Sequence, residues 1–202
     1  MPELPEVETV CKGLLPAMRG QRIRRIETRR RDLRIPFPKN LRDIEGDTVT
    51  DITRRAKYIL IHFKSGQVMI VHLGMSGRMT VHEKNKTVAA QKHDHMVITL
   101  GNGTVIVFND PRRFGLVDLA MTKTIGQHRF FKSLGPEPLD KSFTAGVLQK
   151  KLQGKKIAVK VAVMDQRVVV GVGNIYASES LFMADINPRR AAGTLSLSEL
   201  KK

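Results

Sequence analysis

The first residues of the chain have the pattern of an amphipathic helix. Pro5 followed by Glu6 and Glu8 is typical of a first helical turn, because proline needs no backbone donor there and acids interact favourably with the positive end of the helix dipole. Apolar residues then recur with the spacing of one helix face, at Val7, Val10, Cys11 and Leu14. We therefore expect a helix of about three turns directly after the N-terminus.

From Val49 to about Leu119 the pattern changes to short, β-branched segments bounded by turn residues. The clearest of these segments are residues 58–63, 68–73, 97–100 and 105–108. Asn102-Gly103 lies between the last two and predicts a tight hairpin turn, since both central positions of such a turn favour positive φ. An antiparallel β-sandwich is the expected product.

After Gly135-Pro136-Glu137-Pro138 the pattern becomes helical, so we predict a first domain over residues 1–134 and a second over residues 135–202. Ser142 or Thr144 can cap the first helix of the second domain. A second helix should begin near Gly173-Asn174 and end at Asn187-Pro188.

A third helix should open at Ser196, because Ser196 and Glu199 have the spacing of a capping box. Only about two turns' worth of residues follow, which is short of the usual helix length of about eleven residues. The predicted fold class is therefore α+β: an N-terminal helix plus an antiparallel β-sandwich, followed by an incomplete helical domain.

The net charge of the chain limits the classes of partner that it is expected to bind. Lysine and arginine number 35 against 19 acidic residues, which gives a formal net charge of +16 in 202 residues. Hydrophobic residues make up 41%, enough for a genuine core. A protein this basic usually binds a polyanion, and a ribosomal or other non-catalytic basic protein remains open at this point.

Cysteine usage and the N-terminus indicate the compartment. Cys11 is the only cysteine, so an intramolecular disulfide and a cysteine-based zinc site are both excluded, as fits a reducing compartment. Acidic residues stand where a secretory signal would carry positive charge, and no apolar run approaches the roughly 18 residues of a membrane span. We expect a cytoplasmic protein with no membrane partner.

Seven segments carry a resemblance to a known family. They are residues 1–10 (MPELPEVETV), 55–58 (RAKY), 72–77 (HLGMSG), 92–95 (KHDH), 110–115 (DPRRFG), 134–139 (LGPEPL) and 170–179 (VGVGNIYASE). In this order they resemble formamidopyrimidine-DNA glycosylases over essentially the whole chain. The resemblance implies a monomer that acts on double-stranded DNA, excises oxidised purines such as 8-oxoguanine and formamidopyrimidines, and cleaves the abasic site by β,δ-elimination. It also implies that the helical domain is of the helix-two-turns-helix type.

Pro2 is the candidate nucleophile. Removal of Met1 would leave a secondary amine at the terminus, and an α-amine titrates near about 8 whereas lysine titrates near about 10.4. More of the terminal amine is therefore free base at neutral pH. It can attack the sugar carbon of a damaged nucleotide, displace the base and form an iminium ion. A merely permissive residue after the initiator, or a tautomerase-like general base, would also explain a proline here.

Glu3 beside Pro2 favours the catalytic interpretation. A carboxylate at this place can exchange a proton with the opening sugar ring, and the resemblance gives Glu3 that role. Glu6 lies close to the same chemistry, but capping of the helix start explains it equally well.

Several polar residues match DNA-binding positions of the family. Lys57 would bind a phosphate beside the lesion and support catalysis at the sugar, although a solvated strand end is the ordinary alternative. Asn174 lies near a helix N-terminus, where backbone donors suit an anion. The resemblance assigns DNA contacts to His72, His93, Arg112, Lys160 and Asn174.

Three residues match those that fill the gap left by an extruded nucleotide. Met75 and Phe114 would cover the unstacked neighbours, and Arg112 would pair with the orphaned base. Core packing is the alternative for the two apolar residues, but the glycines around Met75 and the Asp110-Pro111 step favour loops.

The resemblance has one departure. The family continues into a zinc finger with four cysteines, which this sequence lacks, so we expect no metal and no other cofactor. An endonuclease VIII-like enzyme for oxidised pyrimidines and a truncated DNA-binding protein without full catalysis remain alternatives. Leu4 and the complete set of gap-filling residues favour the purine branch.

Overall fold

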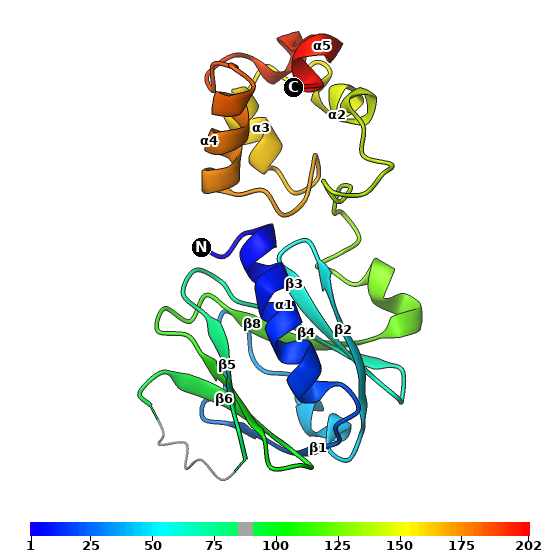
Figure 1. The fold of residues 1–202 in the computed structure, drawn as a ribbon, viewed down its shortest axis with the longest axis vertical. Helices are drawn as coiled ribbons and strands as arrows, with labels where there is room; N and C mark the ends of the chain where they lie inside the picture. The colour runs from blue at the N-terminus through cyan, green and yellow to red at the C-terminus, as the bar shows by residue number, and fades with distance from the viewer. Residues whose placement is uncertain (85–90) are drawn as a thin grey trace. The chain divides into compact units, whose positions relative to one another are not determined.

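The computed structural model describes residues 1–84 and 91–202, and they divide into two units, Met1–His128 and Arg129–Lys202 (Figure 1). The division falls shortly before residue 134, where the sequence pattern changes. The first unit contains α1 (Leu4–Met18), β1 (Ile23–Thr28), η1 (Leu41–Ile44), β2 (Val49–Arg55), β3 (Tyr58–Phe63), β4 (Gln67–His72), β5 (Arg78–His82), β6 (Asp94–Leu100), β7 (Val105–Asn109), β8 (Leu116–Met121) and η2 (Thr122–Gln127).

The N-terminal helix α1 begins as the sequence predicts and runs to Met18, longer than the predicted three turns. Its start is a capping box, in which Glu3 and Glu6 each accept a hydrogen bond from the other's backbone N–H. The residues it buries follow the helical spacing: Leu4, Val7, Cys11, Leu14 and Met18.

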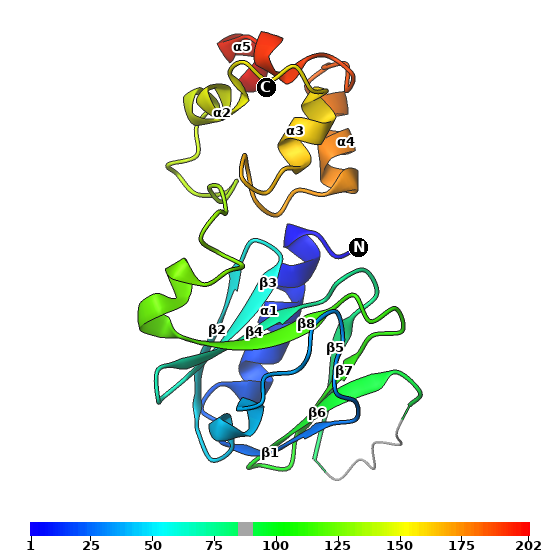
Figure 2. The same cartoon turned by 180° about the vertical axis from the view of Figure 1, so that it is seen from behind.

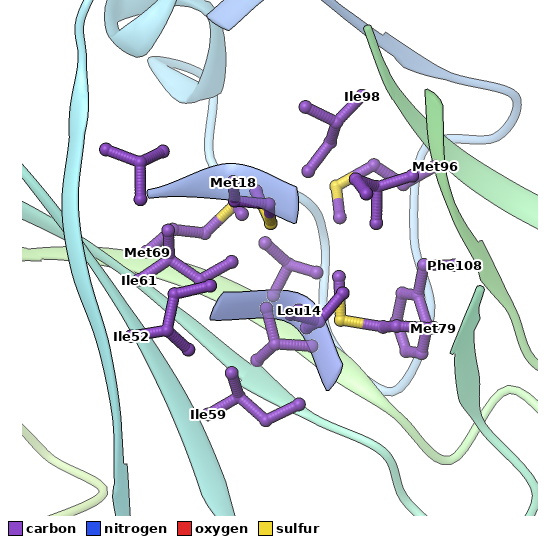
Figure 3. Packing of buried hydrophobic residues seen from close by; sticks show 14 of the residues in the cluster. Leu14, Met18, Ile52, Ile59, Ile61, Met69, Met79, Met96, Ile98 and Phe108 are labelled. Atoms are coloured by element: carbon purple, nitrogen blue, oxygen red, sulfur yellow. The ribbon is translucent and has the colours of Figure 1, made fainter. Parts of the chain in front are cut away.

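The strands form two antiparallel four-stranded sheets with the orders β1-β6-β7-β5 and β2-β3-β4-β8 (Figure 2). Both sheets and the apolar face of α1 contribute to one core, where Leu14 and Met18 lie among Ile61 and Met69 of one sheet and Met96 of the other (Figure 3). The predicted α+β class with an antiparallel sandwich is therefore confirmed. Strand β1, whose arginines interrupt the apolar alternation, was not predicted.

The predicted hairpin joins β6 to β7, with Thr99 opposite Val105. Its turn differs from the predicted type. Gly103 has φ 87°, but Asn102 does not have a positive φ. In the described part of the chain, the non-glycine residues with positive φ are Ala56, Arg113 and Asp185. The N–H of Gly103 donates to Leu100 (3.0 Å) and the N–H of Leu100 to Thr104 (2.9 Å), so the connection is a longer loop with a single left-handed glycine.

The second unit is helical and has its own apolar core. It contains α2 (Ala145–Leu152), α3 (Val159–Met164), α4 (Asn174–Met183), η3 (Ala192–Thr194) and α5 (Leu197–Leu200). Thr144 caps α2 by accepting from the N–H of Val147 (3.3 Å), and the capping box of Ser196 and Glu199 is present at α5. The short α3 was not predicted.

The end of α4 differs from the prediction. The helix stops at Met183 rather than at Asn187-Pro188, and Asp185 then takes φ 55°, a left-handed conformation that breaks the helical path. Across residues 1–84 and 91–202, none of the helices combines the length and hydropathy that crossing a lipid bilayer would require.

Candidate functional site

The N-terminal end of α1 brings Pro2 and Glu3 to the start of the site. Pro2 is half-buried, and Glu3 is 2% exposed although it is an acid. The N–H of Glu3 donates to Oε2 of Glu6 (2.9 Å). A carboxylate buried at a helix N-terminus benefits from the helix dipole as well as from the hydrogen bond of the capping box. Glu6, which is exposed, therefore has a capping contact that accounts for its place in the sequence.

Lys57 lies beside these acids in the turn between β2 and β3. It is 7% exposed, which contradicts a solvated strand end. Burial lowers the pKa of Lys57, while the nearby charges of Glu3 and Glu6 act in the opposite direction. The turn itself is fixed to α1, because Arg54 pairs with Glu8 (3.0 Å) and donates to the carbonyl of Ala56.

His72 ends β4 opposite Tyr58, and the two ring centroids are 4.8 Å apart. The N–H of Gly74 donates to Nδ1 of His72 (2.9 Å), so the neutral ring carries its proton on Nε2. Burial, followed by the charges of Arg34 and Lys57, lowers the pKa of His72 to about 4. A neutral imidazole with a free Nε2–H is a hydrogen-bond donor suited to a phosphate oxygen.

Arg34 belongs to this group and was missed in the sequence. It is exposed in the segment between β1 and η1, and its charge influences the pKa of both Tyr58 and His72. Its backbone N–H donates to the carbonyl of Gly115 (3.1 Å). Nothing in the local sequence separates Arg34 from its basic neighbours, since only the tertiary path of this segment brings it to the site.

The predicted gap-filling residues come from two loops, Leu73–Gly77 and Asp110–Gly115. Met75 and Phe114 are 42% and 45% exposed, which contradicts the core alternative for both. The guanidinium carbon of Arg112 lies 4.9 Å from the centroid of the Phe114 ring, so these side chains are stacked.

The Asp110–Gly115 loop also approaches His93. The carbonyl of His93 accepts from the N–H of Asp110 (3.0 Å), and its ring packs edge-on against His95 with centroids 6.3 Å apart. The first unit thus gathers Pro2, Glu3 and Lys57 in one group, and Met75, Arg112, Phe114 and His93 in another, with His72 beside Lys57.

The second unit holds Lys160 and Asn174. Lys160 is half-buried on α3, and its N–H donates to the carbonyl of Pro188 (3.3 Å). Asn174 is the first residue of α4 and is exposed, and the N-terminus of a helix is a place where backbone donors suit an anion. The preceding loop contains Gly171 with φ 81°.

Two family models match the chain. The formamidopyrimidine-DNA glycosylase N-terminal domain matches residues 1–117, and the formamidopyrimidine-DNA glycosylase H2TH domain matches residues 134–202. The chain belongs to the formamidopyrimidine-DNA glycosylase family. The resemblance read from the seven segments is confirmed, and with it the assignment to a family of DNA-repair glycosylases that bind damaged DNA.

Individual glycosylases of this family are similar over almost the whole chain. Formamidopyrimidine-DNA glycosylase of Ruegeria pomeroyi is 48% identical over 99% of this chain and 73% of its own length, and that of Photobacterium profundum is 48% identical over 97% and 71%. Among solved structures, the complex of Lactococcus lactis Fpg with DNA containing an abasic site has a TM-score of 0.90 at 30% identity, covering 98% of this chain and 72% of that one. A complex of a Lactococcus lactis FPG mutant with DNA containing Fapy-dG has a TM-score of 0.89 at 32% identity.

The zinc finger that the glycosylase family implies does not fit the residues present. Cys11, the single cysteine, lies in the core, where its Sγ donates to the carbonyl of Thr53 and burial raises its pKa to about 12. In the described part of the chain, no group of three histidine, cysteine, aspartate or glutamate side chains could hold a metal ion. No step of the chemistry below uses zinc.

Proposed function

We propose that this chain is a bifunctional DNA glycosylase and AP lyase that removes oxidised purines and then cleaves the strand by β,δ-elimination. The observation that carries the proposal is the grouping at the start of α1, where two side chains that normally prefer water, those of Glu3 and Lys57, are both buried beside the residue that would bear the terminal amine. Burial lowers the pKa of Lys57, and ionisable groups perturbed in this way concentrate at functional sites.

The glycosylase step begins after loss of Met1. The lone pair of the Pro2 amine forms a bond to C1′ of the damaged nucleotide, and the electrons of the N-glycosidic bond leave with the base, which takes up a proton. The amine then loses its proton, and its lone pair opens the C1′–O4′ bond to form an iminium ion. Glu3, adjacent to Pro2, donates the proton that the ring oxygen needs.

The lyase step uses the iminium ion as an electron sink. Loss of a proton from C2′ expels the 3′ phosphate, and a second elimination expels the 5′ phosphate. Water then hydrolyses the remaining iminium ion and frees the amine. Lys57 stabilises the phosphate charge beside the sugar, since a buried cation acts in a medium of lower effective dielectric constant.

DNA binding is assigned to His72, His93, Arg112, Lys160 and Asn174, with Arg34 as an addition. Phosphate contacts from such groups position the duplex without reading its sequence. Met75, Arg112 and Phe114 fill the space vacated by the extruded lesion, because their exposure on two loops leaves them able to enter a duplex. The relative solved with DNA that contains an abasic site supports damaged DNA as the partner. We propose that the DNA is double-stranded and that the chain acts as a monomer in the cytoplasm.

The decisive experiment is borohydride trapping on duplex DNA containing an abasic site or 8-oxoguanine. The purified chain should form a covalent complex, and peptide mapping should locate the link at Pro2. Pro2→Gly should weaken trapping, and a chain that retains Met1 should form no complex.

Lys57 is the competing nucleophile, because its lowered pKa leaves more of its amine uncharged. Lys57→Arg keeps the positive charge but removes this nucleophile, so trapping through Pro2 should persist. A Met1-blocked chain that cross-links as well as the processed one would overturn the Pro2 assignment. Binding without any trapping would favour a DNA-binding protein without catalysis, and preference for oxidised pyrimidines would favour the endonuclease VIII-like alternative.

A further inference from the structure

We infer that Asp110 and Ser76 form a clip that holds the two gap-filling loops together as one preassembled wedge, which makes Asp110 a positioning residue for the extrusion of paired lesions. The inference rests on the proposed function, because it assumes that Met75, Arg112 and Phe114 enter the duplex. The clip is defined here as the Asp110 carboxylate and the Ser76 hydroxyl.

Asp110 is fully buried between β7 and β8, and its carboxylate accepts hydrogen bonds from both loops. Oδ1 accepts from the hydroxyl of Ser76 (2.7 Å) and from the N–H of Arg112 (3.3 Å), while Oδ2 accepts from the N–H of Gly115 (2.8 Å). The Ser76 hydroxyl also accepts from the N–H of Arg112 (3.2 Å). One carboxylate therefore links the loop that carries Met75 to both sides of Phe114.

The backbone of Asp110 is itself fixed to the start of strand β6 and to the residue before it. Its N–H donates to the carbonyl of His93 (3.0 Å), and its carbonyl lies 2.8 Å from Nε2 of His95, a buried residue. A buried carboxylate is tolerated only when hydrogen bonds replace its lost hydration. The clip is thus anchored in the sandwich and supports the exposed side chains beyond it.

The loops also touch through their backbones. A Cβ added to Gly74 would lie 2.3 Å from the carbonyl carbon of Phe114, and one added to Gly115 would lie 2.9 Å from the carbonyl oxygen of His72. No side chain fits between the two loops at these points. Close backbone packing and the shared carboxylate together restrict how far Met75 can move independently of Phe114.

This restriction matters most when a paired lesion is extruded. Unstacking a base costs free energy, and a wedge that is already ordered offsets this cost without first losing its own conformational freedom. A preformed abasic site has no base to extrude, so its cleavage depends far less on the wedge. The clip should therefore discriminate between these two substrates.

Ser76→Ala tests the clip with the smallest change, and Ser76→Thr is the matched control because it keeps the hydroxyl. Single-turnover excision of 8-oxoguanine from a duplex should slow by about tenfold or more in Ser76→Ala, since a hydrogen bond to a charged group is worth roughly 1.5–3 kcal/mol. Cleavage of a preformed abasic site should stay within about twofold, and Ser76→Thr should recover most of the excision rate. Asp110→Asn should show the same selectivity, because an amide has one acceptor oxygen, so its NH2 group would face either the N–H of Gly115 or the Ser76 hydroxyl and the N–H of Arg112.

The readouts separate failure of the clip from failure of the proposed function. A 2-aminopurine placed beside the lesion should report slower unstacking in Ser76→Ala, while thermal unfolding shows whether the first unit is intact. Met75→Ala combined with Phe114→Ala is the reference, and equal losses on both substrates in that variant would refute the wedge itself. The clip would be overturned if the reference variant lost excision of the paired lesion selectively while the folded Ser76→Ala and Asp110→Asn chains did not.

Discussion

His72 combines a half-buried ring with two neighbouring cations, and this affects how stability depends on pH. Its pKa is about 4 in the folded chain and ordinarily about 6.5. Between these values the unfolded chain binds a proton that the folded chain does not. The free energy of unfolding should therefore fall as the pH falls from 6.5 toward 4, and His72 contributes no pH dependence above that range.

Replacement His72→Asn should remove this contribution and flatten the stability profile between pH 4 and 6.5. The upper limit of the effect is about 3 kcal/mol, since a tenfold change in proton affinity corresponds to roughly 1.4 kcal/mol. Urea unfolding of the first unit at several pH values measures it. An unchanged slope would mean that His72 binds protons equally in the folded and the unfolded chain over this range.

At the residue scale, the sequence motifs identified Glu3 and Lys57 as candidate catalytic residues but could not predict that their side chains are buried. Burial arises because the start of α1 meets the turn between β2 and β3, which are distant in sequence. Arg34 and Asp110 went unassigned for the same reason. An arginine among arginines and an aspartate before a proline acquire their roles only through contacts that the tertiary fold creates.

The side chain of Gln166 braces the loop before α4. Its Oε1 accepts from the N–H of Gly171 (2.9 Å), and its Nε2 donates to the carbonyls of Met164 (3.1 Å) and Val172 (3.0 Å). The amide group thereby connects the end of α3 to the loop that presents Asn174. Its three hydrogen bonds all go to backbone groups, so one side chain holds these backbone segments together.

Gln166→Ala should loosen this loop and lower the stability of the second unit by about 1–3 kcal/mol, because backbone groups lose their partners. Hydrogen exchange should accelerate at residues 170–174. Gln166→Glu is the control, since it can still accept from Gly171 but cannot donate to the two carbonyls, and it should have an intermediate effect. Equal exchange in all three chains would contradict the bracing role.

At the scale of elements, short sequence patterns predicted the helix starts and the hairpin, which are determined by interactions between residues close in the sequence. The capping residues of α2 and α5 and the hairpin between β6 and β7 were all found from short patterns. Strand β1 was not predicted, because a register shift between Ile23 and Arg25 disrupts its alternation of apolar and polar residues. The six residues of α3 lack a capping side chain at Ala158, so nothing local marks their start.

At the scale of the molecule, each unit has its own hydrophobic cluster and the two clusters share no residue. Leu14 belongs to the cluster of the sandwich, and Leu181 to that of the helical unit. Each cluster can therefore be destabilised separately by truncating one buried side chain. Charge and hydrophobic content predicted a folded, polyanion-binding chain, but these separate cores follow only from the packing.

Leu14→Ala and Leu181→Ala should each cost about 2–5 kcal/mol, in different units. Hydrogen exchange followed by mass spectrometry should show faster exchange in residues 1–128 for the first variant and in residues 129–202 for the second. Calorimetry should resolve more than one transition. Uniform acceleration over both units in either variant would indicate a single cooperative structure.

The position of Cys11 allows thiol labelling to measure how often α1 detaches from the sheets. A thiol reagent attacks the thiolate, and the only sulfhydryl in the sequence lies on the buried face of α1 with a pKa of about 12. Labelling at neutral pH should therefore wait until the helix that positions Glu3 detaches from the sheets. The labelling rate at low reagent concentration, compared with that of the unfolded chain, gives the free energy of this opening. A rate near that of the unfolded chain would show that the helix is detached much of the time.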